Sequence, residues 1–522
     1  MEALVVTKLV LIILATVSIS AVVGDNGIIA KAKLAKNIQA NSIEAEQDAM
    51  NELLKEYENA MPGEGSVGDT ANEIETPEEP DNPEEPQEPT EPEDTTVAVE
   101  SVNLDKTSER IGNKTTLLAT VEPSNASNKS IQWSSSNENV LKVDENGIVT
   151  RISDTARETI TITASAQDGS NKTATCIVEV YPLVTTATDT SHETITTVDK
   201  LGNFVEVPGG FKIASDSSDN VKEGIVVEDS DENQFVWIPV SNINHDGSNL
   251  IKIENEDETT SEVEITLGRY IFDTTTGKVS ITEGKYQYAL NYTSTVTLDS
   301  YFQELTTFRE STQSSGIDGT NATAKDLAGF IESVEENHGY YLARYEASYS
   351  SGNAFGVGND ETYYKPASKV STANSTSSMS YTAGTLWNFI TQGNASKACR
   401  QMYYGNEFVE SDLVNSYAWD TAIVYIQAMG NTNYANQKDG NGTLKNTGST
   451  GDEKCKIFDM ASNCWEWTTE YSTYTDSNDA YHCTLRGGCC HASNFYTSLR
   501  ASTGATGSYE SRSFRVALYV KN

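Results

Sequence analysis

The chain has 522 residues, and 76 acidic against 36 basic side chains give it a formal net charge of -40. A chain of this length is too long for a single hydrophobic core, so we expect about three folded domains. The acidity excludes a nucleic-acid-binding protein, because such a protein needs a basic face to replace the counterions of the phosphates. Seven cysteines without a C-x-x-C pair argue against a zinc ribbon or a thioredoxin-type site.

The N-terminus begins with an apolar stretch over residues 3–23. As a helix, about 21 residues rising about 1.5 Å each match a bilayer core of roughly 30 Å. A signal peptide is the main alternative, since small residues stand near a potential cleavage point. Helical spacing continues to Tyr57 and ends at Pro62. We predict a transmembrane anchor helix with a helical stalk over residues 1–60, in a single-pass cell-membrane protein with the bulk of the chain extracellular.

This N-terminal helix, with Gly24-Asp25-Asn26-Gly27 after its apolar run, resembles the helix of prepilin-like surface proteins. The resemblance implies a leader that ends in Gly and a Glu five residues into the mature helix. Here no leader precedes the span, and Glu2 stands almost at the start. We therefore prefer a plain membrane anchor to a pilin-like structural subunit.

Two contrasting segments follow the stalk. Residues 61–98 repeat Glu-Pro units, which deny the backbone its helix donors and repel one another, so they predict an extended acidic linker. Residues 99–183 show short alternating runs between turn residues, the pattern of an all-β sandwich. Within them we expect a hairpin turn with positive φ at Asn146-Gly147, a core Trp133 and a buried apolar Cys176.

The run Trp133-Ser134-Ser135-Ser136-Asn137, followed by residues 143–149, resembles the bacterial Ig-like group 2 domain. Such modules serve as spacers or adhesive repeats on cell surfaces and phages. A Thr-rich linker over residues 184–199 then leads to the last domain.

Residues 200–522, here called the head, carry five separated motifs: 234–240, 339–347, 458–467, 485–488 and 513–518. They resemble the F-V-W-I-P-V, G-x-Y, D-M-x-G-N-x-W-E-W, R-G-G and G-F-R-V segments of the formylglycine-generating enzyme (sulfatase-modifying factor) family. The resemblance implies an α+β variant of the C-type lectin fold, which serves both enzymes and binding proteins. We also expect a helix over 412–426 with one apolar face, and we interpret residues 241–335 as a polar insertion without an assigned role.

The resemblance implies that a set of residues holds the scaffold of the head: Trp465, Trp467, Arg486, Gly487, Gly488, Phe514 and Arg515. The family's enzymes oxidise a substrate cysteine with Cu(I) held by two thiolates, a soft-ligand arrangement. The positions of those thiolates are Ala492 and Thr497 here. Cys489 and Cys490 are adjacent, and neighbours on a strand point to opposite faces, so we expect one buried and one exposed thiol. We expect no enzyme, no catalytic residue, no metal site and no copper, whereas the abundant oxygen ligands leave a Ca²⁺ cofactor open.

Residues 489–509 consist mostly of types that an asparagine codon reaches by changing its adenines. They resemble the variable region of proteins diversified by diversity-generating retroelements, which occupies this place in the same fold. A rigid scaffold would then present large aromatic contacts beside adaptable polar ones. The predicted ligand-binding residues are His491, Asn494, Phe495, Tyr496, Ser498, Ser508, Tyr509 and Arg512.

Together these features predict a multidomain bacterial or prophage-encoded surface protein. An anchor helix, an acidic spacer and an Ig-like module would display a lectin-like head for adhesion to a protein or glycan on another surface. The alternatives are a formylglycine-generating-type oxidoreductase, which the unmatched cysteine pair disfavours, and the pilin-like subunit.

Overall fold

The computed structural model describes residues 96–521, apart from 189–191, 281–284, 288–292, 296–300, 313–319, 439–441, 474, 477–478, 481 and 492–494. The predicted anchor (1–60) and nearly all of the predicted acidic linker (61–98) lie outside these residues. Within the described part of the chain, no helix combines the length and the apolar character needed to cross a membrane.

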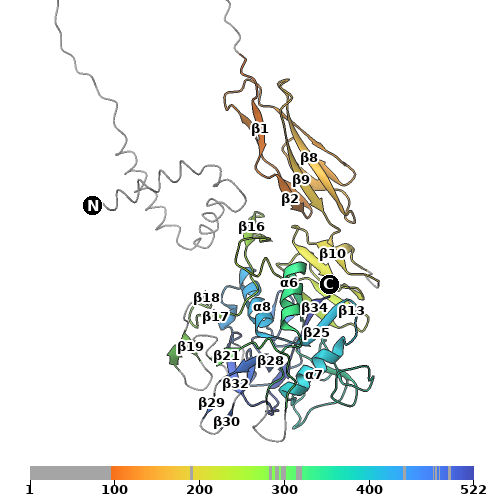
Figure 1. The fold of residues 1–522 in the computed structure, drawn as a ribbon, viewed down its shortest axis with the longest axis vertical. Helices are drawn as coiled ribbons and strands as arrows, with labels where there is room; N and C mark the ends of the chain where they lie inside the picture. The colour runs from red at the N-terminus through yellow and green to blue at the C-terminus, as the bar shows by residue number, and fades with distance from the viewer. Residues whose placement is uncertain are drawn as a thin grey trace, which may run out of the picture. The chain divides into compact units, whose positions relative to one another are not determined.

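The first described domain is all-β, as the alternating pattern predicts (Figure 1). One sheet has the order β2-β9-β8-β5, a second has the order β3-β7-β6, and β1 pairs with β4. The strands are β1 (Ser101–Leu104), β2 (Ser108–Ile111), β3 (Lys114–Thr116), β4 (Ala119–Glu122), β5 (Ile131–Ser135), β6 (Leu141–Val143), β7 (Ile148–Arg151), β8 (Glu158–Ala166) and β9 (Thr173–Val180).

Strand β9 shows why this domain folds: Cys176 and Val178 are fully buried while Ile177 between them is 49% exposed. Successive side chains on a strand face opposite sides, so one face supplies the core. The prediction that Cys176 is a buried apolar filler is confirmed, and so is the turn between β6 and β7, where Gly147 has φ +77°. Trp133, predicted to lie in the core, is half-buried and packs against two small core clusters.

The predicted Thr-rich linker is partly structured. Val184–Thr186 form the 3-10 helix η1, and β10 (Ile195–Val198) pairs with β11 (Phe204–Val207), the first strand of the head. The buried Val198 and Val205 place the inner face of this hairpin against the domain it introduces.

The head is built on two sheets that share one core. The larger has the order β12-β13-β14-β22-β34-β25, and the smaller has the order β21-β28-β31-β32 with β33 parallel to β28. Their strands are β12 (Phe211–Ile213), β13 (Val226–Asp229), β14 (Gln234–Pro239), β22 (Gly339–Ala343), β34 (Val516–Val520), β25 (Val409–Leu413), β21 (Phe302–Gln303), β28 (Trp465–Ser472), β31 (Cys483–Arg486), β32 (Arg500–Thr503) and β33 (Arg512–Phe514).

Helices α6 (Leu327–Asn337), α7 (Gln392–Met402) and α8 (Ser416–Ala428) complete this α+β domain (Figure 1). Two of the predicted motifs pair with each other, since β14 and β22 run antiparallel with Trp237 opposite Tyr341. Both strands are almost continuously buried, as expected where a sheet is covered on both faces.

Helix α8 confirms the predicted helix but begins later than expected. Asp412 and Leu413 belong to β25, and the helix starts after Asn415, whose side-chain oxygen accepts the Ala418 amide at 2.8 Å. Asparagine is a favoured N-cap because it satisfies one of the free amides of the first turn.

Residues 241–335 are more than an insertion, which corrects the interpretation above. Leu267, Tyr270 and Phe272 belong to the main core cluster of the head. Arg269 donates to Glu470 and Glu304 accepts from Ser416, both inside the head. The segment therefore completes the core, although its own polar composition hides this role.

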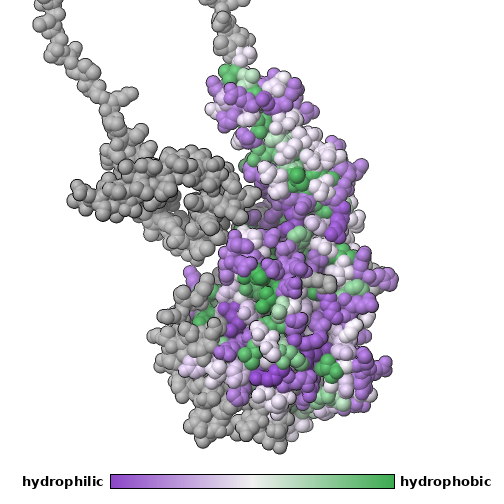
Figure 2. Space-filling model, viewed as in Figure 1, coloured by the Kyte–Doolittle hydropathy of each residue, from purple (hydrophilic) through white to green (hydrophobic). Residues whose placement is uncertain are grey.

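The described surface is polar, in line with the charge of the chain. On the face shown in Figure 2, hydrophilic residues predominate and hydrophobic ones are dispersed among them. Large exposed hydrophobic side chains are correspondingly scattered, for example Ile177 in the first domain and Val370 and Tyr509 in the head.

Candidate ligand-binding site

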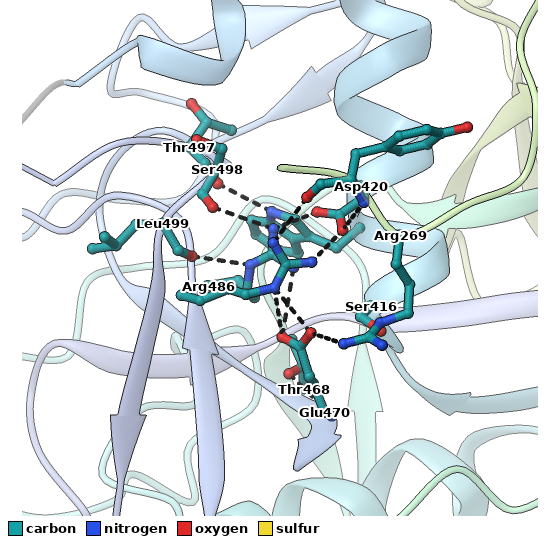
Figure 3. Close-up of polar contacts among 12 residues, drawn as sticks. Arg269, Ser416, Asp420, Thr468, Glu470, Arg486, Thr497, Ser498 and Leu499 are labelled. Atoms are coloured by element: carbon teal, nitrogen blue, oxygen red, sulfur yellow. Dashed lines mark hydrogen bonds and ion pairs between the residues drawn. The ribbon is translucent and has the colours of Figure 1, made fainter. Parts of the chain in front are cut away.

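The residues around the R-G-G turn are held by a buried ion network (Figure 3). Arg486 Nη2 lies 2.5 Å from Asp420 Oδ1, and its Nε donates to the Leu499 carbonyl at 2.9 Å. Arg269 Nη2 and Arg500 Nε lie 2.8 and 2.9 Å from Glu470 Oε1. Charged side chains from β28, β31, β32 and helix α8, together with Arg269, thus meet in one buried network.

Electrostatics in this network favour the ionised carboxylate of Glu470. Burial alone would raise its pKa, but Arg500, Arg269 and Arg486 together lower the pKa to about 2. The carboxylate is therefore charged at all physiological pH values, and the three guanidinium groups depend on it.

A second buried pair fixes the closing strand. Arg515 Nη2 lies 2.7 Å from Glu466 Oε1, and Arg515 also donates to the carbonyls of Ala343 and Phe458 at 2.7 Å. The R-G-G turn itself requires glycine: Gly487 has φ +86°, and a Cβ on Gly488 would lie 1.9 Å from the Ala461 carbonyl oxygen.

The ion network around Glu470, the pair Arg515–Glu466 and the R-G-G turn are here called the frame. Beside the frame lies a pocket with a volume of about 630 Å³. Its walls come from the loop before β33, from Trp465 at the start of β28 and from a distant loop. The lining residues are Ser375, Thr376, Ser377, Phe389, Trp465, His491, Tyr509, Glu510, Ser511 and Arg512.

The backbone of the loop before β33 is tied to its neighbours. The Trp465 amide donates to the Ser511 carbonyl at 2.8 Å, and Asn388 Nδ2 donates to the Glu510 carbonyl at 2.7 Å. The Phe389 amide donates to the Tyr509 carbonyl at 3.1 Å. A loop held in this way presents its side chains without a large ordering cost on binding.

Phe389 has a strained backbone at this pocket wall, with φ +55°. Few residues other than glycine adopt this region, and such strain persists only where the surroundings impose it. Here the Tyr509 carbonyl accepts the Phe389 amide, and the Ser508 hydroxyl donates to the Phe389 carbonyl.

The structure brings together five of the eight predicted ligand-binding residues. His491, Tyr509 and Arg512 line the pocket. The Phe495 ring lies 4.6 Å from the Trp465 ring, centroid to centroid, and Ser508 is exposed beside Phe389.

The other three predicted residues lie elsewhere or outside the described residues. The ring of Tyr496 lies 4.7 Å from Lys438 Nζ. The backbone of Ser498 bonds to Ala435 and accepts from Arg486. Asn494 falls within the undescribed residues 492–494.

The predicted scaffold residues take two kinds of position. Trp467, Arg486, Phe514 and Arg515 are fully buried, and Trp467 Nε1 donates to the Ile390 carbonyl at 2.9 Å. Trp465 is half-buried and lines the pocket, so its ring also faces the candidate site.

Sequence reasoning missed the opposite wall of the pocket. Ser375, Thr376 and Ser377 come from a loop rich in Ser, Thr and Asn. This composition is the one feature of the sequence that could have indicated a binding loop here. Asn374 and Asn388 fix this loop, since Asn374 Nδ2 donates to Asn388 Oδ1 at 2.7 Å. Phe389, Glu510 and Ser511 were also missed.

The cysteine prediction was wrong in one respect: Cys489 and Cys490 are both buried, 2% and 1% exposed. Both follow the end of β31 at Arg486 and lie outside a regular strand, so the alternation of faces does not extend to them. Burial raises the pKa of Cys490 to about 12. Thr497 is buried and Ala492 is not described.

Among the residues that the structure describes, no group of three His, Cys, Asp or Glu side chains could hold a metal ion.

Two family models match the chain. Residues 98–178 match the bacterial Ig-like domain (group 2), and residues 268–519 match the sulfatase-modifying factor enzyme 1-like domain.

Similar curated proteins match short parts of the chain. An uncharacterized protein of Clostridium acetobutylicum is 41% identical over 86 residues, which are 16% of this chain and 9% of that protein. A second one from the same organism is 40% identical over 70 residues, 13% and 17% of the two chains. A 3-O-alpha-D-galactosyl-alpha-L-arabinofuranosidase of Bifidobacterium longum subsp. longum is 37% identical over 86 residues, 16% and 7%. The chain thus spans only a small fraction of these relatives.

Solved structures with similar parts include Treponema denticola variable protein 1, at 13% identity over 34% of this chain and 95% of that chain, with a TM-score of 0.20. An S-layer protein matches at 17% identity over 32% and 25%, with a TM-score of 0.15. Scores this low carry no argument about function. From the family matches, the chain contains a bacterial Ig-like domain of group 2 and a domain of the sulfatase-modifying factor enzyme 1-like family.

Proposed function

We propose that the head binds a ligand in the pocket between residues 375–377 and 509–512 without transforming it, and that the chain is a surface-displayed binding protein. One observation carries the proposal. Residues from sequence-distant loops, Thr376 on one wall and Tyr509 and Arg512 on the other, converge on one pocket whose backbone is fixed by hydrogen bonds.

The composition of the pocket supports recognition. Three aromatic side chains, Phe389, Trp465 and Tyr509, offer rigid contact area, and the hydroxyls of Ser375 and Ser511 offer adaptable hydrogen bonds. This combination is typical of binding sites that are largely formed before the ligand arrives. The Ig-like domain would act as a spacer, and the partner would be a protein or glycan on another surface.

The buried thiols support binding rather than the oxidoreductase alternative. The thiolate, and not the thiol, holds copper and reacts, and burial raises the pKa of Cys490 to about 12. A sulfatase-peptide conversion assay with added copper tests this alternative, and we expect no turnover of the peptide cysteine.

The test of binding uses the full chain on glycan and protein arrays, beside a variant with a blocked pocket. Ser377→Trp places an indole at the pocket wall, whereas Ser350→Trp adds the same side chain at an exposed position of the head outside the pocket. We expect a ligand whose signal is lost in Ser377→Trp and kept in Ser350→Trp. Equal signals for both variants on every ligand would refute the proposal.

A further inference from the structure

Arg512 has an unusual environment for a charged side chain in this protein. Its guanidinium carbon lies 4.4 Å from the ring centroid of Tyr509 and 5.4 Å from that of Trp467. Aromatic faces on this scale attract a guanidinium and hold its plane in one orientation. The group is therefore positioned at the pocket wall rather than free to move.

No carboxylate among the described residues pairs with Arg512, although the chain carries a net charge of -40. Six other arginines of the head have side chains at most 9% exposed, and each has a carboxylate within 4.0 Å: Arg269, Arg344, Arg400, Arg486, Arg500 and Arg515. The head thus pairs its most buried arginines with carboxylates. The half-buried Arg512 has none among the described residues, and the half-buried Arg309 bonds to Asn321 instead.

Of the guanidinium nitrogens of Arg512, Nη1 is enclosed by the protein. A ligand in the pocket would therefore meet Nε and Nη2. Glu510, the nearest carboxylate in sequence, is directed to His491, with 3.8 Å between its Oε2 and the imidazole Nε2. Arg512 thus lines the pocket without a carboxylate partner among the described residues.

We infer, on the basis of the proposed function, that the ligand is an acidic saccharide whose carboxylate pairs with Arg512. A planar guanidinium suits a carboxylate, because it can donate two parallel hydrogen bonds. The sugar ring would lie against Trp465 and Tyr509, and its hydroxyls would bond to Ser375, Thr376 and Ser511.

Hydroxyl-bearing side chains favour a saccharide over an acidic peptide. Five lining residues, Ser375, Thr376, Ser377, Tyr509 and Ser511, carry hydroxyls that both donate and accept, as sugar hydroxyls do. Partners for peptide amides would instead be expected along an exposed sheet edge, whereas only Trp465 and Arg512 among the lining residues belong to strands. The volume of about 630 Å³ lies within the range of small-ligand sites.

The experiment titrates the full chain calorimetrically with matched acidic and neutral probes. The probes are oligosaccharides ending in glucuronate, galacturonate or sialate, the same compounds with the carboxylate converted to an amide, and tetrapeptides containing Asp or Glu. We expect at least one acidic saccharide to bind about 10-fold or more tightly than its amide, the range for a hydrogen bond to a charged group.

Two substitutions and a control locate this preference. Arg512→Met, which keeps the bulk but not the charge, should remove the preference for the acid over the amide. Arg512→Lys should restore it only in part, because an ammonium does not stack or donate in a plane. Lys365→Met removes an exposed charge of the head outside the pocket and should leave the preference unchanged.

The outcomes separate the inference from the proposed function. Equal affinity for acid and amide, or tighter binding of the tetrapeptides, overturns the acidic saccharide, and these wild-type results hold even if the Arg512 variants misfold. Failure of every acidic saccharide to bind also overturns it, while an array ligand lost in Ser377→Trp would still support binding at the pocket. Only the absence of any such ligand refutes the proposed function itself.

Discussion

Replacing Glu470 with Gln removes the charge on which three buried guanidinium groups depend. Gln keeps the size of the side chain and can still accept one hydrogen bond, so the packing is preserved. Arg486 and Arg500 would then keep the carboxylate of Asp420, whereas Arg269 would lose its ion pair with Glu470. The substitution therefore isolates the electrostatic contribution of one carboxylate to the stability of the head.

The magnitude follows from the pKa of Glu470, which is about 2 in the folded head against an ordinary 4.5. A difference of this size corresponds to about 3 kcal/mol of stability at neutral pH. Breaking a buried ion pair by removing one partner costs about 3 to 5 kcal/mol, in agreement. Because the folded pKa is depressed, this stability is complete above pH 4.5 and is lost as the pH falls toward 2.

The assay is urea unfolding followed by tryptophan fluorescence, since five of the six tryptophans lie in the head. Glu335→Gln, on the exposed surface of α6, is the matched control and should change stability by less than about 0.5 kcal/mol. The difference between wild type and Glu470→Gln should be about 3 kcal/mol at pH 7 and should shrink below pH 4.5. A difference under about 1 kcal/mol at pH 7, or one independent of pH, would refute the reasoning.

Three further outcomes are expected. Gly488→Ala should destabilise the head by about 3 kcal/mol in urea unfolding, because the added Cβ would overlap the Ala461 carbonyl. Gly430→Ala is the control, since it has open space at φ +109° and should cost only about 1 to 2 kcal/mol. Equal costs for the two substitutions would contradict the steric reason. At pH 8, a disulfide reagent should label Cys490 roughly 100-fold more slowly in the native chain than in urea, because burial raises the pKa of this thiol to about 12. Mass spectrometry of the labelled peptides measures the two rates. Fast labelling of the native chain would contradict the buried position. Burial raises the pKa of Glu206 to about 7, so stability falls as the pH rises from 4.5 to 7. Glu206→Gln should therefore stabilise by about 3 kcal/mol at pH 8 but little at pH 4 in thermal unfolding, and an equal gain at both pH values would argue against this titration.

The sequence predicts the framework of the head well because local patterns determine it. The segment Gln234–Pro239 is predicted from its resemblance to the family's F-V-W-I-P-V strand, and it forms β14. The spacing of Ala418, Ala422 and Ile426 indicates one face of helix α8. The R-G-G turn is predictable as well, since a positive φ and a close backbone contact leave room only for glycine.

Only one wall of the pocket could be predicted from the sequence. His491, Tyr509 and Arg512 are close in sequence, so their resemblance to a variable region places them together. Their partners at Ser375–Ser377 are more than a hundred residues away, in a polar loop without periodicity, and only the tertiary fold brings them near. The same limit applies to residues 241–335, whose contribution to the core depends on a few side chains such as Arg269.

The separation between frame and pocket has a consequence for how this protein could change over generations. The ion network around Glu470 and the pair Arg515–Glu466 share no charged side chain with Arg512. Effects of substitutions at independent sites usually add, so a new side chain at the pocket rim would alter what is recognised while the frame keeps its own stability. A single architecture could in this way supply a repertoire of specificities.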